Sequence, residues 1–497
     1  MEKKRETNVL IVTIAVFVAT FMTAIEGTIV TTAMPTIVGS LHGIEIMNWV
    51  FSIYLLTNAM FTPICGKLAD KIGRRSIFIF GTLVFIIGSA MCGFSNTMLT
   101  LIISRAIQGI GAGAMMPVAL TILADMYSAE KRAKMLGLNS TAWGIASVVG
   151  PLTGGVIVDT IGWHWIFFIN VPIGLVLIGL VSYYLVEEKQ EKDNKKMDIQ
   201  GSLFLMTMLL TLLLAFQFLS ESGFDLKVIG MLGATILSIF LFIRAEKNAE
   251  DPVISLELFS SRIFIVVNLV AALISGFLMA VEVYIPMWMQ GVLGYKAGLG
   301  GLVLAPLSIL WVYGSSLVGR WMVLHSMKTV LLRTLGIALI GGVSLLVIPM
   351  KMPFIVFLVI SGITGIGVGG TIVATTVQAQ NSVGMDQLGV ATSFNTLSKT
   401  IGQTVMVSVF GLILNTITRT ELAKAALTDD PDIMNKLVNP QTAKLLPENL
   451  LLPLREILHQ GLWGIYVAGV ALVLLAIGSV LLLKKETITG AEVRKII

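Results

Sequence analysis

The sequence predicts an all-α integral membrane protein with fourteen transmembrane helices, arranged as two six-helix bundles plus two inserted helices. The first observation is composition: 56% of the 497 residues are hydrophobic and only 13% are charged, about half the charged share of an ordinary soluble domain. The second is that apolar runs of roughly 20 residues, long enough to cross about 30 Å of hydrocarbon, recur along the whole chain. The third is that charge-rich stretches flank the seventh and eighth runs, which sets that pair apart as an insert.

Hydropathy places the helices, and the basic residues orient them. Of the 34 lysines and arginines, 24 lie in segments that are inside, and 8 in loops that are outside, if the N-terminus is cytoplasmic. Cytoplasmic loops carry an excess of Lys and Arg, so both termini are expected in the cytoplasm. The first helix is expected to be uncleaved, because no small-residue cleavage site follows it. The predicted spans lie near 9–31, 47–66, 77–95, 98–124, 135–158, 165–186, 199–219, 226–243, 263–289, 298–319, 328–349, 353–376, 389–415 and 461–483.

The order of the spans predicts three regions. Residues 1–190 form an N-terminal six-span bundle, 191–255 a linker with the two inserted spans, and 256–497 a C-terminal six-span bundle. The segment 416–460 is the only long external loop. It mixes charged and apolar residues with prolines, so it forms either a short amphipathic hairpin or a solvated connector.

The sequence offers no site for enzyme chemistry, a cofactor or a metal. It contains no G-x-x-x-x-G-K-[ST] loop to hold nucleotide phosphates. The four histidines (His42, His164, His325 and His459) lie at span ends or in loops, without metal-ligand spacing. The net charge of +5 comes from short basic blocks between apolar spans, which points to membrane orientation rather than to nucleic-acid binding. Transport driven by an ion gradient is therefore the leading expectation.

Six stretches carry a family resemblance. They are "IEGTIVTTAMP" (25–35), "GKLADKIGRRSIF" (66–78), "LIISRAIQGIGAG" (101–113), "ASVVGPLTGG" (146–155), "WHWIFFINVPIG" (163–174) and "GVATSFNTLSKTIGQTV" (389–405). Together they resemble the major facilitator superfamily, and within it the fourteen-span drug:proton antiporters of the quaternary-ammonium exporter type. Two positions depart from the pattern: Glu26 stands where the first signature usually has aspartate, and His164 where the "WRWIFFIN" signature has arginine.

Two charges lie within predicted spans of the first bundle. Glu26 and Arg105 are both in the outer half of the membrane, at similar depth. Charges in a span are costly and normally face a cavity or a partner. They either couple protons or bind substrate, or they form an ion pair that only holds two spans together; we favour the functional interpretation. Glu26 would bind a proton or a cationic substrate, but not both.

The second bundle has its own candidates. Glu282 lies in the ninth span at a depth close to that of Glu26, and it either faces the same central cavity or is a rim residue that touches water. Lys399 lies on a polar stripe of the thirteenth span and either neutralises a carboxylate or pairs with backbone carbonyls. The polar residues expected to line a cavity are Asn58, Gln108, Gln378, Asn395, Lys399 and Gln403.

Two further groups have mechanical roles implied by the resemblance. The inner latch, which would help to hold the cytoplasmic side closed, comprises Gly66, Lys67, Asp70, Gly73, Arg74 and Arg75. The positive-inside rule alone would explain only its basic residues. The antiporter helix, which would pack against a helix of the other half and limit leak, carries Gly150, Pro151, Gly154 and Gly155. A kink at the proline is the simpler interpretation of that group.

The sequence thus predicts a non-enzymatic, proton-coupled antiporter that exports amphipathic or cationic drugs by alternating access. Its expected partners are membrane lipid, protons and a small amphipathic substrate; it is expected to act as a monomer in the cell membrane of a bacterium and to confer antibiotic resistance. One alternative is the same fold exporting a lipid, fatty acid or amino acid, with Arg105 and Lys399 binding the anion. A non-transporting receptor or scaffold is the other, and for it Glu26→Gln should change nothing.

Overall fold

A computed structural model describes residues 7–127, 129–186, 198–249, 256–383, 388–425, 430 and 432–483. All regular secondary structure in these ranges is helical. Thirteen helices there are long and apolar enough to cross a membrane, and Ile145–Thr160 is a shorter apolar helix. The predicted all-α membrane architecture is therefore confirmed.

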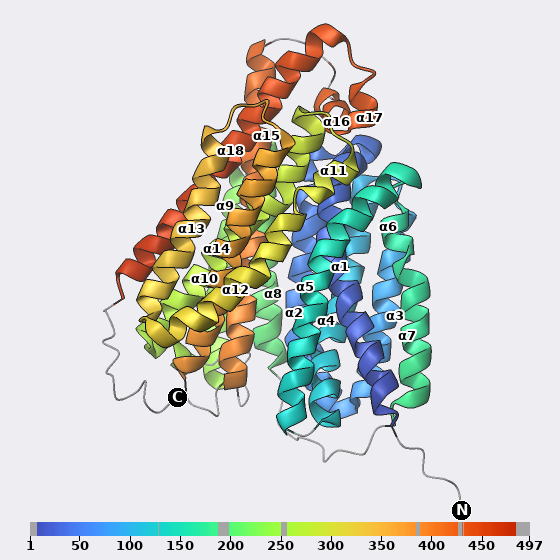
Figure 1. The fold of residues 1–497 in the computed structure, drawn as a ribbon, viewed down its shortest axis with the longest axis vertical. Helices are drawn as coiled ribbons and strands as arrows, with labels where there is room; N and C mark the ends of the chain where they lie inside the picture. The colour runs from blue at the N-terminus through green and yellow to red at the C-terminus, as the bar shows by residue number, and fades with distance from the viewer. Residues whose placement is uncertain are drawn as a thin grey trace, which may run out of the picture. The chain divides into compact units, whose positions relative to one another are not determined.

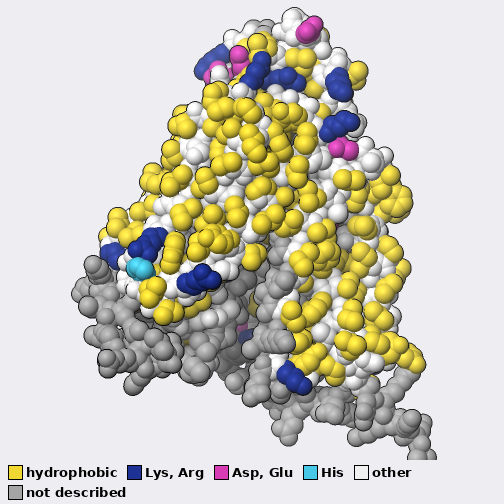
Figure 2. Space-filling view, in the orientation of Figure 1, with side chains coloured by type: hydrophobic (Ala, Val, Ile, Leu, Met, Phe, Trp, Pro, Cys, Tyr) yellow, Lys and Arg dark blue, Asp and Glu magenta, His cyan; other side chains and the backbone are white. Residues whose placement is uncertain are grey.

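The surface of the helices is that of a membrane protein. On the face shown in Figure 2, hydrophobic side chains cover the helices, and Lys, Arg, Asp and Glu side chains gather near the helix ends. Large apolar side chains such as Phe240, Ile236 and Leu475 are 60% exposed or more. Exposing so much apolar surface to water is unfavourable, whereas contact of the same surface with lipid is favourable.

The chain divides into two compact units (Figure 1). Unit 1 comprises Met1–Val253 together with Lys296–Gly301. Its helices are α1 (Val9–Leu41), η1 (Ile44–Ile46), α2 (Asn48–Ile72), α3 (Arg74–Gly93), α4 (Met98–Met126), α5 (Ala129–Thr160), α6 (Trp165–Phe168), α7 (Asn170–Tyr184), the inserted α8 (Ile199–Ser222) and α9 (Leu226–Asn248), and most of α11 (Ala297–Leu302).

Unit 2 comprises Ile254–Tyr295 and Leu302–Ile497. Its helices are η2 (Leu256–Ser260), α10 (Arg262–Met287) with the π-helical turn η3 (Trp288–Val292), α12 (Ala305–Leu324), α13 (Met327–Val347), α14 (Phe354–Asn381), α15 (Leu388–Ala425), α16 (Ile433–Val438), α17 (Pro440–Ala443) and α18 (Glu448–Leu481).

Short polar side chains fix where several helices begin. Asn8, Asp198, Asp225 and Ser261 each accept a hydrogen bond from a backbone N–H in the first turn of the helix that follows. Thr97 does the same for α4 within a reciprocal capping box. These caps satisfy N–H groups that would otherwise lack a partner at each helix start.

Glycine lets the helices of unit 1 approach closely around an apolar core. A methyl group added to Gly81 of α3 would lie 2.8 Å from the backbone nitrogen of Met115 in α4. The core around this contact is built from buried Phe78, Phe85 and Leu123. Outside this core, the inserted α8 is attached to α2 by a hydrogen bond from Trp49 Nε1 to Gln217 Oε1.

Several helices extend beyond their predicted ends. The helix α1 continues ten residues past position 31, and α18 begins at Glu448 instead of residue 461. Residues 416–460 are expected from the sequence to form either a short amphipathic hairpin or a solvated connector, and their described part between α15 and α18 contains the short helices α16 and α17. Hydropathy marks only the portion of a helix that lies in hydrocarbon, whereas helical hydrogen bonding continues into water.

Candidate functional site

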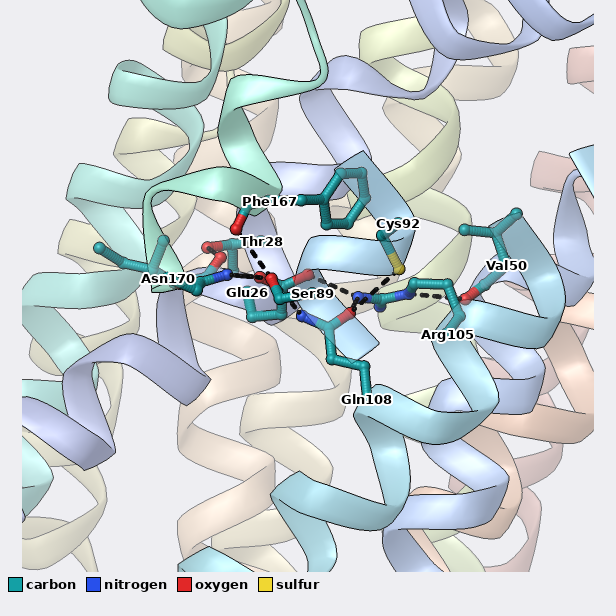
Figure 3. Close-up of polar contacts among 10 residues, drawn as sticks. Glu26, Thr28, Val50, Ser89, Cys92, Arg105, Gln108, Phe167 and Asn170 are labelled. Atoms are coloured by element: carbon teal, nitrogen blue, oxygen red, sulfur yellow. Dashed lines mark hydrogen bonds and ion pairs between the residues drawn. The ribbon is translucent and has the colours of Figure 1, made fainter. Parts of the chain in front are cut away.

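The two charges predicted inside the first bundle form a buried ion pair (Figure 3). Arg105 Nη1 on α4 donates to Glu26 Oε1 on α1 at 2.5 Å. Glu26 is 0% exposed and Arg105 is 1% exposed. Solvent screening is therefore minimal, and each charge depends on the other for compensation.

The Arg105 guanidinium has further partners on α2 and α4. Its Nε donates to the Val50 carbonyl oxygen at 3.2 Å, and its Nη1 also donates to Gln108 Oε1 at 2.8 Å. Its Cζ lies 4.0 Å from the centre of the Tyr54 ring, within cation–π range. The guanidinium is thus fixed by one carboxylate, two neutral oxygens and an aromatic face.

The second oxygen of Glu26 is held from α7. Asn170 Nδ2 donates to Glu26 Oε2 at 2.7 Å and to Ser89 Oγ at 2.9 Å. Ser89 also accepts from Gln108 Nε2 at 3.2 Å and donates to the Phe167 carbonyl oxygen at 2.8 Å. We call Glu26, Ser89, Arg105, Gln108 and Asn170 the charge cluster.

A break between two helices positions part of the charge cluster. The short helix α6 ends at Phe168, and α7 begins at Asn170. Asn170 therefore starts a helix next to Glu26, and the carbonyl of Phe167 is available to accept from Ser89. The members of the cluster lie on α1, α3, α4 and α7, and α6 contributes the Phe167 carbonyl, all within unit 1 (Figure 3).

The chemistry open to the charge cluster is proton exchange and recognition of a cation. An ionised carboxylate accepts hydrogen bonds only, and protonation turns one oxygen into a donor. A proton on Glu26 would cancel its attraction for Arg105 in a site without screening water. Among the described residues, no group of three or more His, Cys, Asp or Glu side chains could hold a metal ion.

Unit 2 holds the other predicted charges, and neither forms an ion pair with a described residue. Glu282 on α10 is partly exposed and makes no hydrogen bond within the part of the chain that the structure describes. Lys399 on α15 is also partly exposed, and its Nζ donates to Thr376 Oγ1 at 3.1 Å. Asn395, one turn away, is fully buried and bonded to Asn268 and Thr376.

The remaining predicted cavity residues are more dispersed. Asn58 on α2 is partly exposed, and its Oδ1 accepts from Thr62 at 3.3 Å. Gln378 on α14 is 9% exposed, and Gln403 on α15 is partly exposed. Only Gln108 among the predicted cavity residues belongs to the charge cluster.

The inner latch is tied to helices α4 and α7. Arg74 forms an ion pair with Asp125 and donates to the Thr121 carbonyl oxygen at 3.4 Å. Arg75 donates to the Ser182 carbonyl oxygen. The side chain of Asp70 lies outside the described residues. Gly66 and Lys67 are partly exposed on α2.

Gly73 has a conformational role in the same latch. Its φ is 116° and its ψ is 139°, a region that L-residues with a Cβ rarely adopt. The turn from α2 into α3, which carries the latch arginines, therefore requires glycine at this position.

The antiporter helix packs closely on two neighbours within unit 1. A methyl group on Gly154 would lie 2.6 Å from Ile29 Cγ1 of α1, and one on Gly150 would meet Thr28. On its other side, a methyl group on Gly155 would lie 2.8 Å from the carbonyl oxygen of Ala297, at the start of α11. Pro151 lies inside α5, at its close contact with Gly301.

A carboxylate strengthens the α5–α11 contact. Asp159 Oδ1 accepts from the backbone N–H of Ala297 at 3.3 Å, and Oδ2 accepts from that of Gly298 at 2.9 Å. A side-chain oxygen on the first N–H groups of a helix satisfies donors that have no partner in the helix. The segment Lys296–Gly301, which follows α10 in sequence, is thereby attached to unit 1.

His164, the second departure from the family signature, stacks on Trp163 with ring centres 3.8 Å apart. It precedes α6 and lies outside the membrane span. Burial lowers the pKa of His164 from its usual value. Position 164 therefore carries no fixed charge at neutral pH, unlike the arginine of the signature.

The many apolar helices define a multi-pass membrane protein that buries an ion pair within one unit. The family model described as Major Facilitator Superfamily matches residues 16–407. The chain belongs to the Major Facilitator Superfamily, as the sequence motifs predicted.

Its relatives and structural neighbours are transporters. The chain is 33% identical over 416 residues to the multidrug transporter protein MdtP of Bacillus subtilis, covering 83% of this chain and 76% of that one. It is 35% identical over 425 residues to multidrug resistance protein 3 of the same species, covering 85% and 82%. A solved bacterial homologue of the human lysosomal transporter Spinster shares the fold, with a TM-score of 0.67 at 17% identity, covering 96% of this chain and 98% of that one.

Sequence reasoning missed three members of the site. Asn170 lies within the signature stretch 163–174, which by itself indicates no role for this residue. Ser89 and Tyr54 lie in spans as single polar groups, with no motif to mark them. The only signal is depth: in the predicted topology, Ser89 and Asn170 lie toward the same side of the membrane as Glu26.

Proposed function

We propose that the chain exports amphipathic, cationic drugs in exchange for protons. The observation that carries the proposal is Glu26, a fully buried carboxylate on a membrane helix whose two oxygens are held by Arg105 and Asn170. A charge at such depth is costly and is a functional hypothesis by default. The printed names of MdtP and of multidrug resistance protein 3 support drugs as the cargo.

In the mechanism that we propose, Glu26 carries the proton. A proton on Glu26 would leave Arg105 with neutral acceptors only, so the contact between α1 and α4 would weaken. A cationic drug near Glu26 would compete with the proton for the same negative charge. Alternate occupancy by proton and drug would couple the two fluxes as the transporter alternates between its two faces.

We propose the same orientation for the chain as the basic residues predict, with both termini in the cytoplasm of a bacterial cell and a monomer as the working unit. The inner latch and the antiporter helix would limit leak on their respective sides. Glu282 would be a second acidic group for cation or proton. These assignments rest on the charge distribution and on the contacts described above.

Ethidium efflux from cells tests the proposal. Cells that express the native chain should extrude the dye, an uncoupler should stop extrusion, and Glu26→Gln should abolish it at matched membrane abundance. Glu45→Gln is the matched control, because Glu45 is an exposed carboxylate of the same unit, and it should retain native efflux. Native cells without efflux would refute drug export, and an active Glu26→Gln variant would refute the role of Glu26.

A further inference from the structure

Helix α15 carries a polar face inside a membrane span. At helical spacing this face comprises Thr392, Asn395, Thr396, Lys399, Thr400 and Gln403. Asn395 at one edge is 0% exposed, whereas Thr396 is exposed. Further along the same side, Val407 is again 0% exposed. Lipid does not favour such a polar surface, so the exposed part is suited to water or to a polar ligand.

Lys399 lies on this face between the buried and the exposed residues. Its ammonium group has three donors, and within the described residues it has one partner, the hydroxyl of Thr376 at 3.1 Å. No described carboxylate pairs with it. Arg105 in unit 1 differs in this respect, because Glu26 compensates its charge. A cation in a membrane span without a counterion favours the binding of an anion.

The polar side chains that connect Lys399 to α14 and α10 are already hydrogen-bonded to one another. Thr376 Oγ1 lies 3.0 Å from Asn395 Oδ1, and Asn395 Nδ2 donates to Asn268 Oδ1 at 3.0 Å. Asn268 Nδ2 in turn donates to the Phe264 carbonyl oxygen at 2.8 Å. This chain of bonds crosses from α14 through α15 to α10 and fixes the hydroxyl that holds the ammonium. The remaining capacity to bind a ligand therefore lies with Lys399 itself.

We propose that Lys399 binds the carboxylate of a zwitterionic amphipathic substrate. The inference rests on the proposed function and narrows its substrate class: such a drug carries a carboxylate as well as a cationic centre. An ammonium–carboxylate contact is charge-assisted and strong when partly desolvated. The hydroxyls of Thr396 and Thr400 already donate to the carbonyl oxygens of Thr392 and Thr396, at 3.0 Å and 3.1 Å, so the Lys399 ammonium is the donor for the carboxylate.

Two dyes that differ at one group test this inference. Rhodamine 110 has a free carboxylate, and rhodamine 123 is its methyl ester. Uptake of each dye into everted membrane vesicles, driven by a proton gradient, is compared for the native chain, Lys399→Met and Lys399→Arg. Lys351→Met is the matched control, because Lys351 is an exposed lysine of the same unit outside the spans. Lys399→Gln serves as a second neutral variant if Lys399→Met does not reach the membrane.

The neutral variants should lower transport of rhodamine 110 by about tenfold or more, the size of one lost charge-assisted contact, and change rhodamine 123 by less than twofold. Lys399→Arg should retain both. Equal loss of both dyes would overturn the inference and make Lys399 structural, and so would unchanged transport of rhodamine 110. A native chain that moves rhodamine 123 but not rhodamine 110 overturns the carboxylate site and leaves cation export standing. Transport of neither dye would overturn both proposals.

Discussion

Replacing Arg105 alone should destabilise the chain far more than replacing Arg105 and Glu26 together. Arg105→Met removes the donors to Glu26, Gln108 and the Val50 carbonyl, and it leaves the Glu26 carboxylate buried with neutral partners such as Asn170. Breaking one side of a buried ion pair costs about 3–5 kcal/mol, because an uncompensated charge stays buried.

The double variant Glu26→Gln, Arg105→Met buries no charge. The new amide oxygen can still accept from Asn170, and methionine follows much of the apolar path of the arginine stem. Replacing a buried ion pair by neutral groups is often nearly neutral. We therefore expect the double variant to recover about 2 kcal/mol or more of the loss caused by Arg105→Met.

Thermal unfolding of the purified chain in detergent measures this difference. The free cysteines Cys65 and Cys92 are both buried, so a thiol-reactive fluorophore reports unfolding without added labels. The Sγ atom of Cys92 lies 3.7 Å from Oε1 of Gln108, a member of the charge cluster. Because the substitutions change this cluster, circular dichroism should be recorded as an unfolding probe that does not depend on Cys92. If Arg105→Met and the double variant unfold at the same temperature, the two charges do not stabilise each other and the reasoning fails. The double variant should be stable but unable to couple transport to protons.

Two further predictions concern the ends of the spans. Gly73→Ala should lower stability by about 1–3 kcal/mol, since alanine is strained at that φ, whereas Gly66→Ala should be near neutral because its methyl group would meet only ordinary contacts; equal effects in thermal unfolding would contradict the prediction. Asp159→Ala should loosen the start of α11, because the N–H groups of Ala297 and Gly298 lose their acceptor. To measure this, Ala297→Cys is labelled with a thiol reagent in the native chain and in the Asp159→Ala variant. The cysteine should react several times faster in the Asp159→Ala variant, and equal labelling rates would show that Asp159 does not hold the start of α11.

Hydropathy and charge predicted the membrane helices because each span must satisfy its own backbone in lipid. The same rule could not locate the helix ends. Residues 448–460 mix charged and apolar side chains and read as loop, yet they form the first turns of α18. Hydropathy also could not detect the break between α11 and α12, because the residues on both sides of that break are apolar and many of them are small. Hydropathy indicates whether a segment is surrounded by lipid or by water, but it does not indicate where the backbone hydrogen bonds of a helix begin or end.

The charged members of the candidate site were predictable, and the neutral ones were not. A glutamate and an arginine in spans are rare enough to be noticed. Asn170 and Ser89 are ordinary polar residues, which often join membrane helices without any further role. Their importance comes from three-dimensional geometry: Asn170 holds the second oxygen of Glu26, and Ser89 connects it to Gln108. No spacing along the chain relates these positions, which lie on different helices.

The two units differ in how the charge within their membrane spans is compensated. In unit 1, Glu26 and Arg105 neutralise each other and are sealed from solvent, so an incoming proton must first disturb the cluster. In unit 2, Lys399 has a hydroxyl partner and a partly exposed position, so an anionic group can reach it without breaking an ion pair. Under the two proposals, this difference assigns coupling to Glu26 and recognition of the carboxylate to Lys399. Glu26→Gln should therefore abolish transport of both rhodamines, whereas neutral variants of Lys399 should change the ratio between them.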